Sequence, residues 1–273
     1  MNRDEIRDGL NKLQPSIPWA HHFDLGHGIV TVTPDAENFY RKAVRLNALA
    51  ELLPSILRLA MQRDSFEGLR CLDLGSAEGA HSIFMAEAGA AEGLGLEGRH
   101  LYVDRATFVA RVKGVTNVAF RQADIRTLDM ATIGSYDLVL CSGILHHLDK
   151  DAFLKTTQLL HDLTGDSLIL FTHVSSEWVS DKFRLQPTDP IAGKYHGSLF
   201  REHKAESTQA ERLAKVRASL DNEHFFWARE ESLVERFVDV GFKTIIKVYE
   251  PAFVLTHMER VYRGIWVLRR KTP

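Results

Sequence analysis

The stretch Leu-Asp-Leu-Gly-Ser-Ala-Glu-Gly at residues 72–79 is the most informative part of this chain. A short buried strand is predicted from Arg70 to Leu74, where Gly75 ends it, and a helix is predicted to begin near Gly79. Glycine permits backbone conformations and close approaches that a Cβ atom blocks. The free N–H groups at the start of such a helix point at whatever ligand lies beyond the strand. We therefore expect a ligand-binding turn here.

This turn differs from the glycine pattern of dinucleotide-binding proteins. That pattern is G-x-G-x-x-G, whereas this chain has Asp-x-Gly-x-x-x-Gly, with Ala77 at the position of the second glycine. Asp73 would repel a diphosphate but suits a cationic or zwitterionic ligand. A second predicted strand, 93–96, ends at Glu97, where nucleotide-binding α/β proteins hold a ribose diol. Taken alone, the turn also fits a generic strand-turn-helix unit that binds another ligand or none.

Two later segments repeat the form of a strand followed by a polar or small-residue turn. Asp124 and Ile125 come just after the apolar run 115–120. Further on, the buried strand predicted over 136–141 leads into the small residues Ser142 and Gly143. A short motif gains weight when its structural context is also present.

With these motifs in this order, the chain resembles the class I S-adenosylmethionine-dependent methyltransferases. The resemblance implies an α/β fold, with a Rossmann-like, doubly wound, seven-stranded sheet that ends in an antiparallel hairpin. It also implies that Glu97 accepts both ribose hydroxyls, that Asp124 accepts from the adenine amine and that Ile125 packs on the ring. The cofactor-binding residues that it implies are Asp73, Gly75, Ser76, Gly79, Glu97, Gly98, Asp124, Ile125, Ser142 and Gly143.

Two charged residues near this site allow two interpretations each. Asp73 supports the first loop, through water to the cofactor ammonium, or it is a structural acid that binds backbone amides. Arg99 is a surface cation, which we favour, or a partner that orients Glu97.

Composition excludes several classes of protein. The 273 residues carry a net charge of −2, so no basic field indicates a nucleic-acid partner. No apolar run approaches the ~18 residues of a membrane span, and the first residues lack the apolar core of a signal peptide. Cys71 and Cys141 fall in predicted strands and are expected to be apolar fillers. No cluster has zinc-like spacing, so we expect no metal, and we expect a cytoplasmic protein.

The order of predicted elements suggests four segments. Residues 1–67 form an N-terminal helical lid or substrate segment, and 68–174 form the cofactor-binding core. Residues 175–230 are an insertion after the fifth strand that caps the substrate, with a charged helical stretch over 201–219. Residues 231–273 complete the sheet with a helix and a hairpin.

Periodicity and turn residues give the individual elements. Turn formers over 21–34 predict a hairpin or extended loop, and a helix is predicted over 35–61 with a kink or boundary at Pro54. The other predicted elements are strands 70–74, 93–96, 115–120, 136–141, 167–173, 243–249 and 262–269, and helices 79–88, 102–112, 150–163 and 230–240.

Candidates for catalysis and substrate binding lie outside the cofactor motifs. His146 follows the fourth motif and His173 ends the fifth strand. For His146 we favour packing or hydrogen bonding over a role as general base. Ligands of such sheets bind beyond the carboxyl ends of the strands, where the flanking segments reach. The substrate candidates in these segments are Trp19, Tyr40, Tyr195, Asn222 and Trp227. The aromatic run 225–227 forms either core or the wall of a pocket for a ring-bearing substrate.

We expect methyl transfer to an oxygen or nitrogen of a small molecule, such as a secondary metabolite. Parts of the chain, among them Ser-Leu-Asp-Asn at 219–222, are distantly similar to the enzyme group that carboxymethylates wobble uridine in tRNA. A tRNA-modifying enzyme, with S-adenosylmethionine or its carboxylated variant, is therefore one alternative. A module that binds the cofactor without turnover is the other. The sequence does not indicate an oligomeric state.

Overall fold

The computed structural model describes residues 1–13, 18–204, 206–215, 218–221, 223–249 and 261–271. The chain divides into two compact units, Met1–Asp124 and Ile125–Pro273, which are described in turn.

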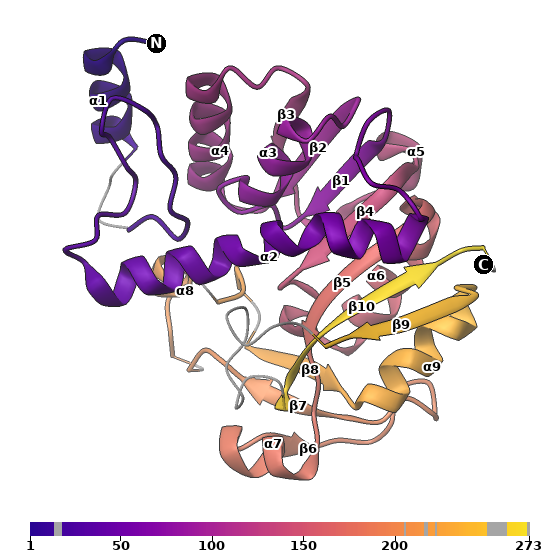
Figure 1. Cartoon of the computed structure of the whole chain (residues 1–273). Coiled ribbons are helices and arrows are strands. Elements are labelled where there is room, and N and C mark those ends of the chain that lie inside the picture. The colour runs from indigo at the N-terminus through magenta and orange to yellow at the C-terminus, as the bar shows by residue number, and fades with distance from the viewer. Residues whose placement is uncertain (14–17, 205, 216–217, 222, 250–260, 272–273) are drawn as a thin grey trace. The chain divides into compact units, whose positions relative to one another are not determined.

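One seven-stranded sheet accounts for the fold class (Figure 1). Its strand order is β3-β2-β1-β4-β5-β10-β9. The strands in that order are β3 (Val118–Gln122), β2 (Glu92–Glu97), β1 (Arg70–Leu74), β4 (Tyr136–Ser142), β5 (Thr164–His173), β10 (Arg263–Arg269) and β9 (Thr244–Val248). β10 is antiparallel to both β5 and β9, while β2 is parallel to both β1 and β3, and β4 is parallel to β5. The predicted Rossmann-like sheet with a terminal antiparallel hairpin is confirmed.

The first unit begins with two helices, α1 (Arg3–Lys12) and α2 (Glu37–Met61). α1 starts with a capping box, in which the side chains of Asn2 and Glu5 each accept from the other's backbone N–H. α2 continues through Pro54, so Pro54 is not a helix boundary, and the alternative of a kink at this residue stays a prediction. Between the helices, a single antiparallel bridge joins Asp24 to Val30, which confirms a short hairpin.

Two helices, α3 (Ala80–Glu87) and α4 (His100–Lys113), follow β1 and β2. Gly114 caps α4 in the left-handed conformation, and the N–H of Val115 still donates to the carbonyl of Ala110. β3 begins at Val118, three residues later than predicted, because Val115 is still bonded to the end of α4.

In the second unit, α6 (Lys150–Leu163) joins β4 to β5. Helix α9 (Glu230–Val240) has the predicted bounds and is capped by Gly241, with φ 119°. The shorter elements are α5 (Met130–Ile133), α7 (Glu177–Phe183), α8 (Gln209–Ala214) and the single-turn helices η1 (Ile125–Thr127) and η2 (Leu145–His147).

The helix predicted over 201–219 is wrong. The insertion contains a three-stranded antiparallel sheet of β6 (Gln186–Pro187), β7 (Gly197–Arg201) and β8 (His224–Ala228). Among the described residues of the predicted stretch, only α8 is helical. Ser198 pairs with Trp227 and Phe200 with Phe225. Of the predicted stretch, Arg201 belongs to this sheet and pairs with His224, so cross-strand pairing outweighs helix propensity at that residue.

Among the described residues, no helix is both long and apolar enough to cross a membrane. Nor does any group of three or more potential metal ligands gather within the described ranges.

Candidate functional site

The loop between β1 and α3 has the predicted strand-turn-helix form. Gly75 and Gly79 have φ values of 74° and 80°, which residues with a Cβ rarely adopt. The N–H groups of Gly75 and Ser76 donate to the carbonyl oxygen of Leu96 at 2.8 and 3.1 Å. A Cβ atom at Gly79 would lie 2.7 Å from the Phe120 ring. The loop is thus held against β2, and position 79 has room only for glycine.

Glu97 ends β2 and contacts this loop. Its Oε2 accepts from the backbone N–H of Ala77 at 3.0 Å, and its Oε1 accepts from that of Arg99 at 2.9 Å. Burial raises the pKa of the Glu97 carboxyl, although these hydrogen bonds and the Arg99 charge act in the opposite direction. Glu97, the residue predicted to hold the ribose, therefore lies beside the loop between β1 and α3, and its contact with ribose stays a prediction. The guanidinium of Arg99 lies 5.9 Å from the centroid of the Tyr102 ring.

Asp73 is buried below the loop. Its Oδ2 accepts from the hydroxyl of Ser82 at 2.7 Å, whereas Oδ1 has no partner among the described residues. Burial raises the pKa of the Asp73 carboxyl to about 6, more than the Ser82 bond lowers it. The hydroxyl of Ser76 is also buried without a described partner. Buried polar atoms are rarely left unpaired, so this loop fits a polar ligand that supplies the missing hydrogen bonds.

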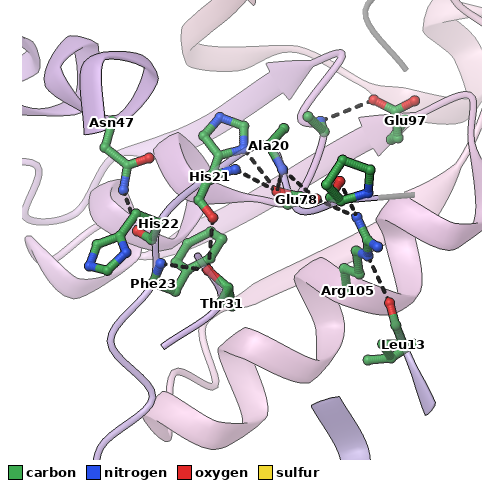
Figure 2. A network of polar contacts seen from close by, with 12 residues as sticks. Leu13, Ala20, His21, His22, Phe23, Thr31, Asn47, Glu78, Glu97 and Arg105 are labelled. Atoms are coloured by element: carbon green, nitrogen blue, oxygen red, sulfur yellow. Dashed lines mark hydrogen bonds and ion pairs between the residues drawn. The ribbon is translucent and has the colours of Figure 1, made fainter. Parts of the chain in front are cut away.

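A fully buried carboxylate in the same loop, Glu78, was not among the sequence-based candidates (Figure 2). Its oxygens accept from the backbone N–H of Ala20 at 3.0 and 3.1 Å and from that of His21 at 2.8 Å. Nδ1 of His21 lies 3.2 Å away, and Nη1 of Arg105 donates at 2.7 Å. Burial raises the pKa of Glu78, but His21 and the Arg105 charge together bring it below its usual value.

The N-terminal candidates Trp19 and Tyr40 both belong to the hydrophobic core of the first unit. Trp19 is buried, and the guanidinium carbon of Arg105 lies 4.6 Å from its ring centroid. Tyr40 packs edge-on against His22 with the ring centroids 5.1 Å apart. Trp19 therefore lies in the surroundings of the Glu78 network, and substrate contact for either residue stays a prediction.

The ends of β2 and β3 place two further cofactor candidates. The carbonyl of Gly98 accepts from the side-chain amide of Gln122 at 3.0 Å. The N–H of Ala123 donates to the carbonyl of Glu97 at 2.9 Å, so Asp124 follows directly after a residue tied to the end of β2. In the second unit, Ile125 begins η1, and Gly143, with φ 77°, follows Ser142 at the end of β4. The roles of these residues in cofactor binding stay predictions.

The structure brings the two candidate catalytic histidines into direct contact. The rings of His146 and His173 are stacked, with centroids 3.6 Å apart and planes at 15°. Nδ1 of His146 lies 3.3 Å from the Thr172 hydroxyl, and its other ring nitrogen has no hydrogen bond to a described residue. Nε2 of His173 accepts from Nε of Arg263 at 2.9 Å. Burial first, and then neighbouring charges, lower the pKa of both histidines well below the usual value, so both rings are neutral at neutral pH.

Aromatic rings surround this histidine pair. The Trp227 ring lies 4.7 Å from His173 and its Nε1 donates to the carbonyl of His146 at 3.1 Å. Tyr262 and Phe183 complete the contacts, at 5.2 Å from His173 and 5.5 Å from Trp227, respectively. Trp227 is only 3% exposed, so it packs in a core that holds the histidines in place.

Two substrate candidates are not part of this cluster. Tyr195 packs against α9, where its hydroxyl donates to Asp239 Oδ2 at 2.6 Å and its ring lies 5.7 Å from the Arg236 guanidinium. Asn222 lies outside the described residues.

Comparison with known proteins agrees with this geometry. Residues 65–216, more than half of the chain, match the family model described as a methyltransferase domain. No protein with curated annotation matches the chain.

Among solved structures, the chain is similar to the N-terminal domain of EvdMO1, crystallised in the presence of S-adenosylhomocysteine (SAH) and D-fucose. The two are 27% identical with a TM-score of 0.69, over 99% of this chain and 98% of that one. A crystal structure described as EvdMO1, without restriction to that domain, is 24% identical with a TM-score of 0.62, over 99% of this chain and 48% of that one.

The magnesium protoporphyrin IX methyltransferase of Synechocystis PCC 6803, with bound SAH, shares the fold. It is 18% identical with a TM-score of 0.56, over 97% of this chain and 94% of that one. The strand-turn-helix motif, the sheet order and the family match lead to one conclusion: the chain belongs to the methyltransferase-domain family and is a class I S-adenosylmethionine-dependent methyltransferase.

Proposed function

We propose that this enzyme transfers the methyl group of S-adenosylmethionine to an oxygen or nitrogen of a small molecule, such as a secondary metabolite. The observation that carries the proposal is a buried, neutral His146 with a ring nitrogen that is not engaged by any described residue. A hydroxyl or protonated nitrogen needs to lose a proton as it is methylated, and a neutral imidazole can accept it.

We assign cofactor binding to residues of the loop between β1 and α3 and to the carboxylates at or just after the ends of β2 and β3. Glu97 would hold the ribose hydroxyls, and Asp124 with Ile125 would hold adenine. Asp73 and Ser76 each have a buried oxygen without a described partner, which fits the polar methionine part. The bound cofactor supplies a methyl group already activated on a sulfonium, so alignment of the acceptor is the main task of the protein.

Three contacts hold His146 in the orientation that a proton-accepting role would need. Its backbone carbonyl is held by Trp227, its ring lies against His173, and Nδ1 faces the Thr172 hydroxyl. If Nδ1–H donates to Thr172, Nε2 carries the lone pair that receives the proton. A ring held in one orientation can take the proton from the bound molecule that receives the methyl group.

The test is turnover with defined acceptors. The purified protein would be incubated with S-adenosylmethionine and a panel of hydroxyl- and amine-bearing molecules, and SAH and methylated products would be measured by mass spectrometry. Because the similar EvdMO1 domain was crystallised in the presence of D-fucose, deoxyhexoses are the first acceptors to include. Methylation of tRNA with no small-molecule product would contradict the proposal.

A pair of variants tests His146. His146→Gln should reduce kcat by about 100-fold or more and leave the affinity for S-adenosylmethionine unchanged, since general-base catalysis typically contributes about 10²–10⁴-fold. His100→Asn is the matched control, because His100 is 74% exposed at its side chain on α4. Unchanged kcat in His146→Gln would remove His146 from the chemistry.

A further inference from the structure

The hydrogen bond between Arg263 and His173 determines where His173 carries its proton. Nε of Arg263 lies 2.9 Å from Nε2 of His173. A guanidinium has only donors and stays protonated in proteins, so Nε2 must provide the lone pair. Since burial, with the charges of Arg263 and His147, lowers the pKa of His173 well below its usual value, the ring is neutral and has one N–H. That N–H is therefore on Nδ1.

Nδ1 of His173 is buried and has no hydrogen-bond partner among the described residues. An unpaired buried donor destabilises the folded protein, because it has lost its hydrogen bond to water without gaining another. Buried polar groups in native proteins usually have a hydrogen-bond partner. A bound ligand with an accepting oxygen would supply one for Nδ1–H of His173.

The ring cannot easily turn away from this orientation. It is stacked on His146 at 3.6 Å, while Trp227 and Tyr262 meet it edge-on at 4.7 and 5.2 Å. The position of Nδ1 is thus fixed by packing on several sides and by Arg263 at the opposite nitrogen.

The donor at Nδ1 also restricts the ligand of His173. An N–H group requires an accepting atom, and an ammonium group has only donors. Among the described contacts, Arg263 donates to the opposite ring nitrogen of His173, and Oε2 of Glu202 lies 3.4 Å from Nδ1 of the neighbouring His147. A neutral or anionic oxygen is therefore favoured at Nδ1 of His173, and an ammonium group is disfavoured.

We propose that Arg263 is a positioning residue: it fixes the proton of His173 on Nδ1, so that His173 donates a hydrogen bond to an oxygen of the methyl acceptor. This inference rests on the proposed function, because it takes the His146 neighbourhood as the acceptor site. It assigns the two histidines different tasks, His146 as base and His173 as donor. It also narrows the acceptor to molecules with an oxygen, neutral or anionic, next to the methylated atom.

The first experiment needs no acceptor. The full chain, labelled with ¹⁵N-histidine, would be studied by NMR, with the His173 signals assigned by their loss in His173→Gln. We expect a protonated Nδ1 and an unprotonated Nε2. Arg263→Lys, which keeps a pure donor, should preserve this tautomer, and Arg263→Met should shift the proton population toward Nε2. A proton on Nε2 in the wild-type enzyme would overturn the inference.

The second experiment measures kinetics with an oxygen acceptor. Arg263→Met should raise the KM for the acceptor about tenfold or more, the loss expected for one hydrogen bond, with rescue by Arg263→Lys. The affinity for S-adenosylmethionine should not change. Arg58→Met, at an exposed arginine paired with Asp64 on α2, is the matched control.

The outcomes separate the two proposals. An altered tautomer in Arg263→Met with an unchanged KM would overturn the donor role of His173 while the proposed function stands. Failure of the wild-type enzyme to methylate any small molecule would overturn the proposed function, and the donor role with it.

Discussion

Nη1 of Arg105 lies 2.7 Å from Oε1 of Glu78, and both side chains are completely buried. The same arginine donates through Nε to the carbonyl of Leu13, and the same carboxylate accepts from the backbone of residues 20 and 21. One ion pair therefore joins the loop between β1 and α3, helix α4 and the N-terminal segment of the first unit (Figure 2). Removing one partner of such a pair leaves a buried charge unpaired, which is strongly destabilising.

We expect Glu78→Gln to lower the free energy of unfolding by about 3–5 kcal/mol, the range for breaking a buried ion pair. Arg105 would lose its charge partner, and the amides of Ala20 and His21 would keep only one acceptor oxygen between them. Denaturation in urea measures the change, and proteolysis near residue 20 reports release of the N-terminal segment.

The control for this variant is Glu92→Gln. Glu92 pairs with Arg70 at 2.7 Å, but both side chains are about half exposed, so its loss should change stability by less than about 1 kcal/mol. Equal effects of the two variants would contradict the importance assigned to the buried pair.

The sequence predicted the parts of this site that are local. Gly75 and Glu97 each stand at a strand end, and a strand end is visible from a few neighbouring residues. Glu78 was missed because its partners lie 57, 58 and 27 residues away, and no local pattern connects them. Within the motif, Asp73 and the glycines carry the local signal, and nothing near Glu78 in the sequence indicates its distant partners.

The same distinction explains the insertion. Residues 201–219 are rich in charged residues that favour helices, and this local propensity is the only signal for secondary structure in the stretch. Arg201, the first residue of that stretch, instead ends β7, where it pairs with His224 of β8, a partner outside the predicted helix. Likewise, His146 and His173 were chosen separately as candidates, but only the fold shows that their rings are stacked and that Arg263 engages one of them.

Glu97→Gln tests the ribose assignment. A carboxylate that accepts from two hydroxyls makes charge-assisted hydrogen bonds, each of about 1.5–3 kcal/mol, so we expect the affinity for S-adenosylmethionine to fall about 10- to 100-fold. Calorimetry measures this affinity directly. Because Glu97 also accepts from Ala77 and Arg99, circular dichroism and melting of the free variant would show whether the loop is still folded. A folded variant with wild-type affinity would place the ribose elsewhere.

Asp73→Asn should stabilise the cofactor-free protein above about pH 7. Burial raises the pKa of Asp73 from 3.8 to about 6, so ionising it in the folded state is unfavourable by up to about 3 kcal/mol. Asparagine removes this penalty, but it also replaces the carboxylate whose unpaired oxygen, Oδ1, we assign to cofactor binding. The expected pattern is a higher melting temperature without S-adenosylmethionine and a smaller increase when it is added. A lower melting temperature at every pH would instead mean that the Ser82 bond to the carboxylate dominates.

The histidine at position 81 should make stability fall in mild acid. Burial lowers the pKa of His81 to about 3, whereas the unfolded value is 6.5. Below pH 6.5 the unfolded chain therefore binds a proton that the folded chain does not, so stability decreases as the pH falls. Between about pH 7.5 and about pH 5.5 this single group should remove about 1.4 kcal/mol.

His81→Leu isolates this effect, since Asp73 and Glu97, whose raised pKa values act in the opposite direction, are present in both proteins. The variant should lose about 1.4 kcal/mol less stability than the wild type over the same pH interval, measured by urea unfolding at each pH. His100→Asn, at an exposed position, should follow the wild-type pH dependence. Parallel curves for wild type and His81→Leu would mean that His81 is protonated in the folded protein, and its burial next to His21 would then require a counter-charge.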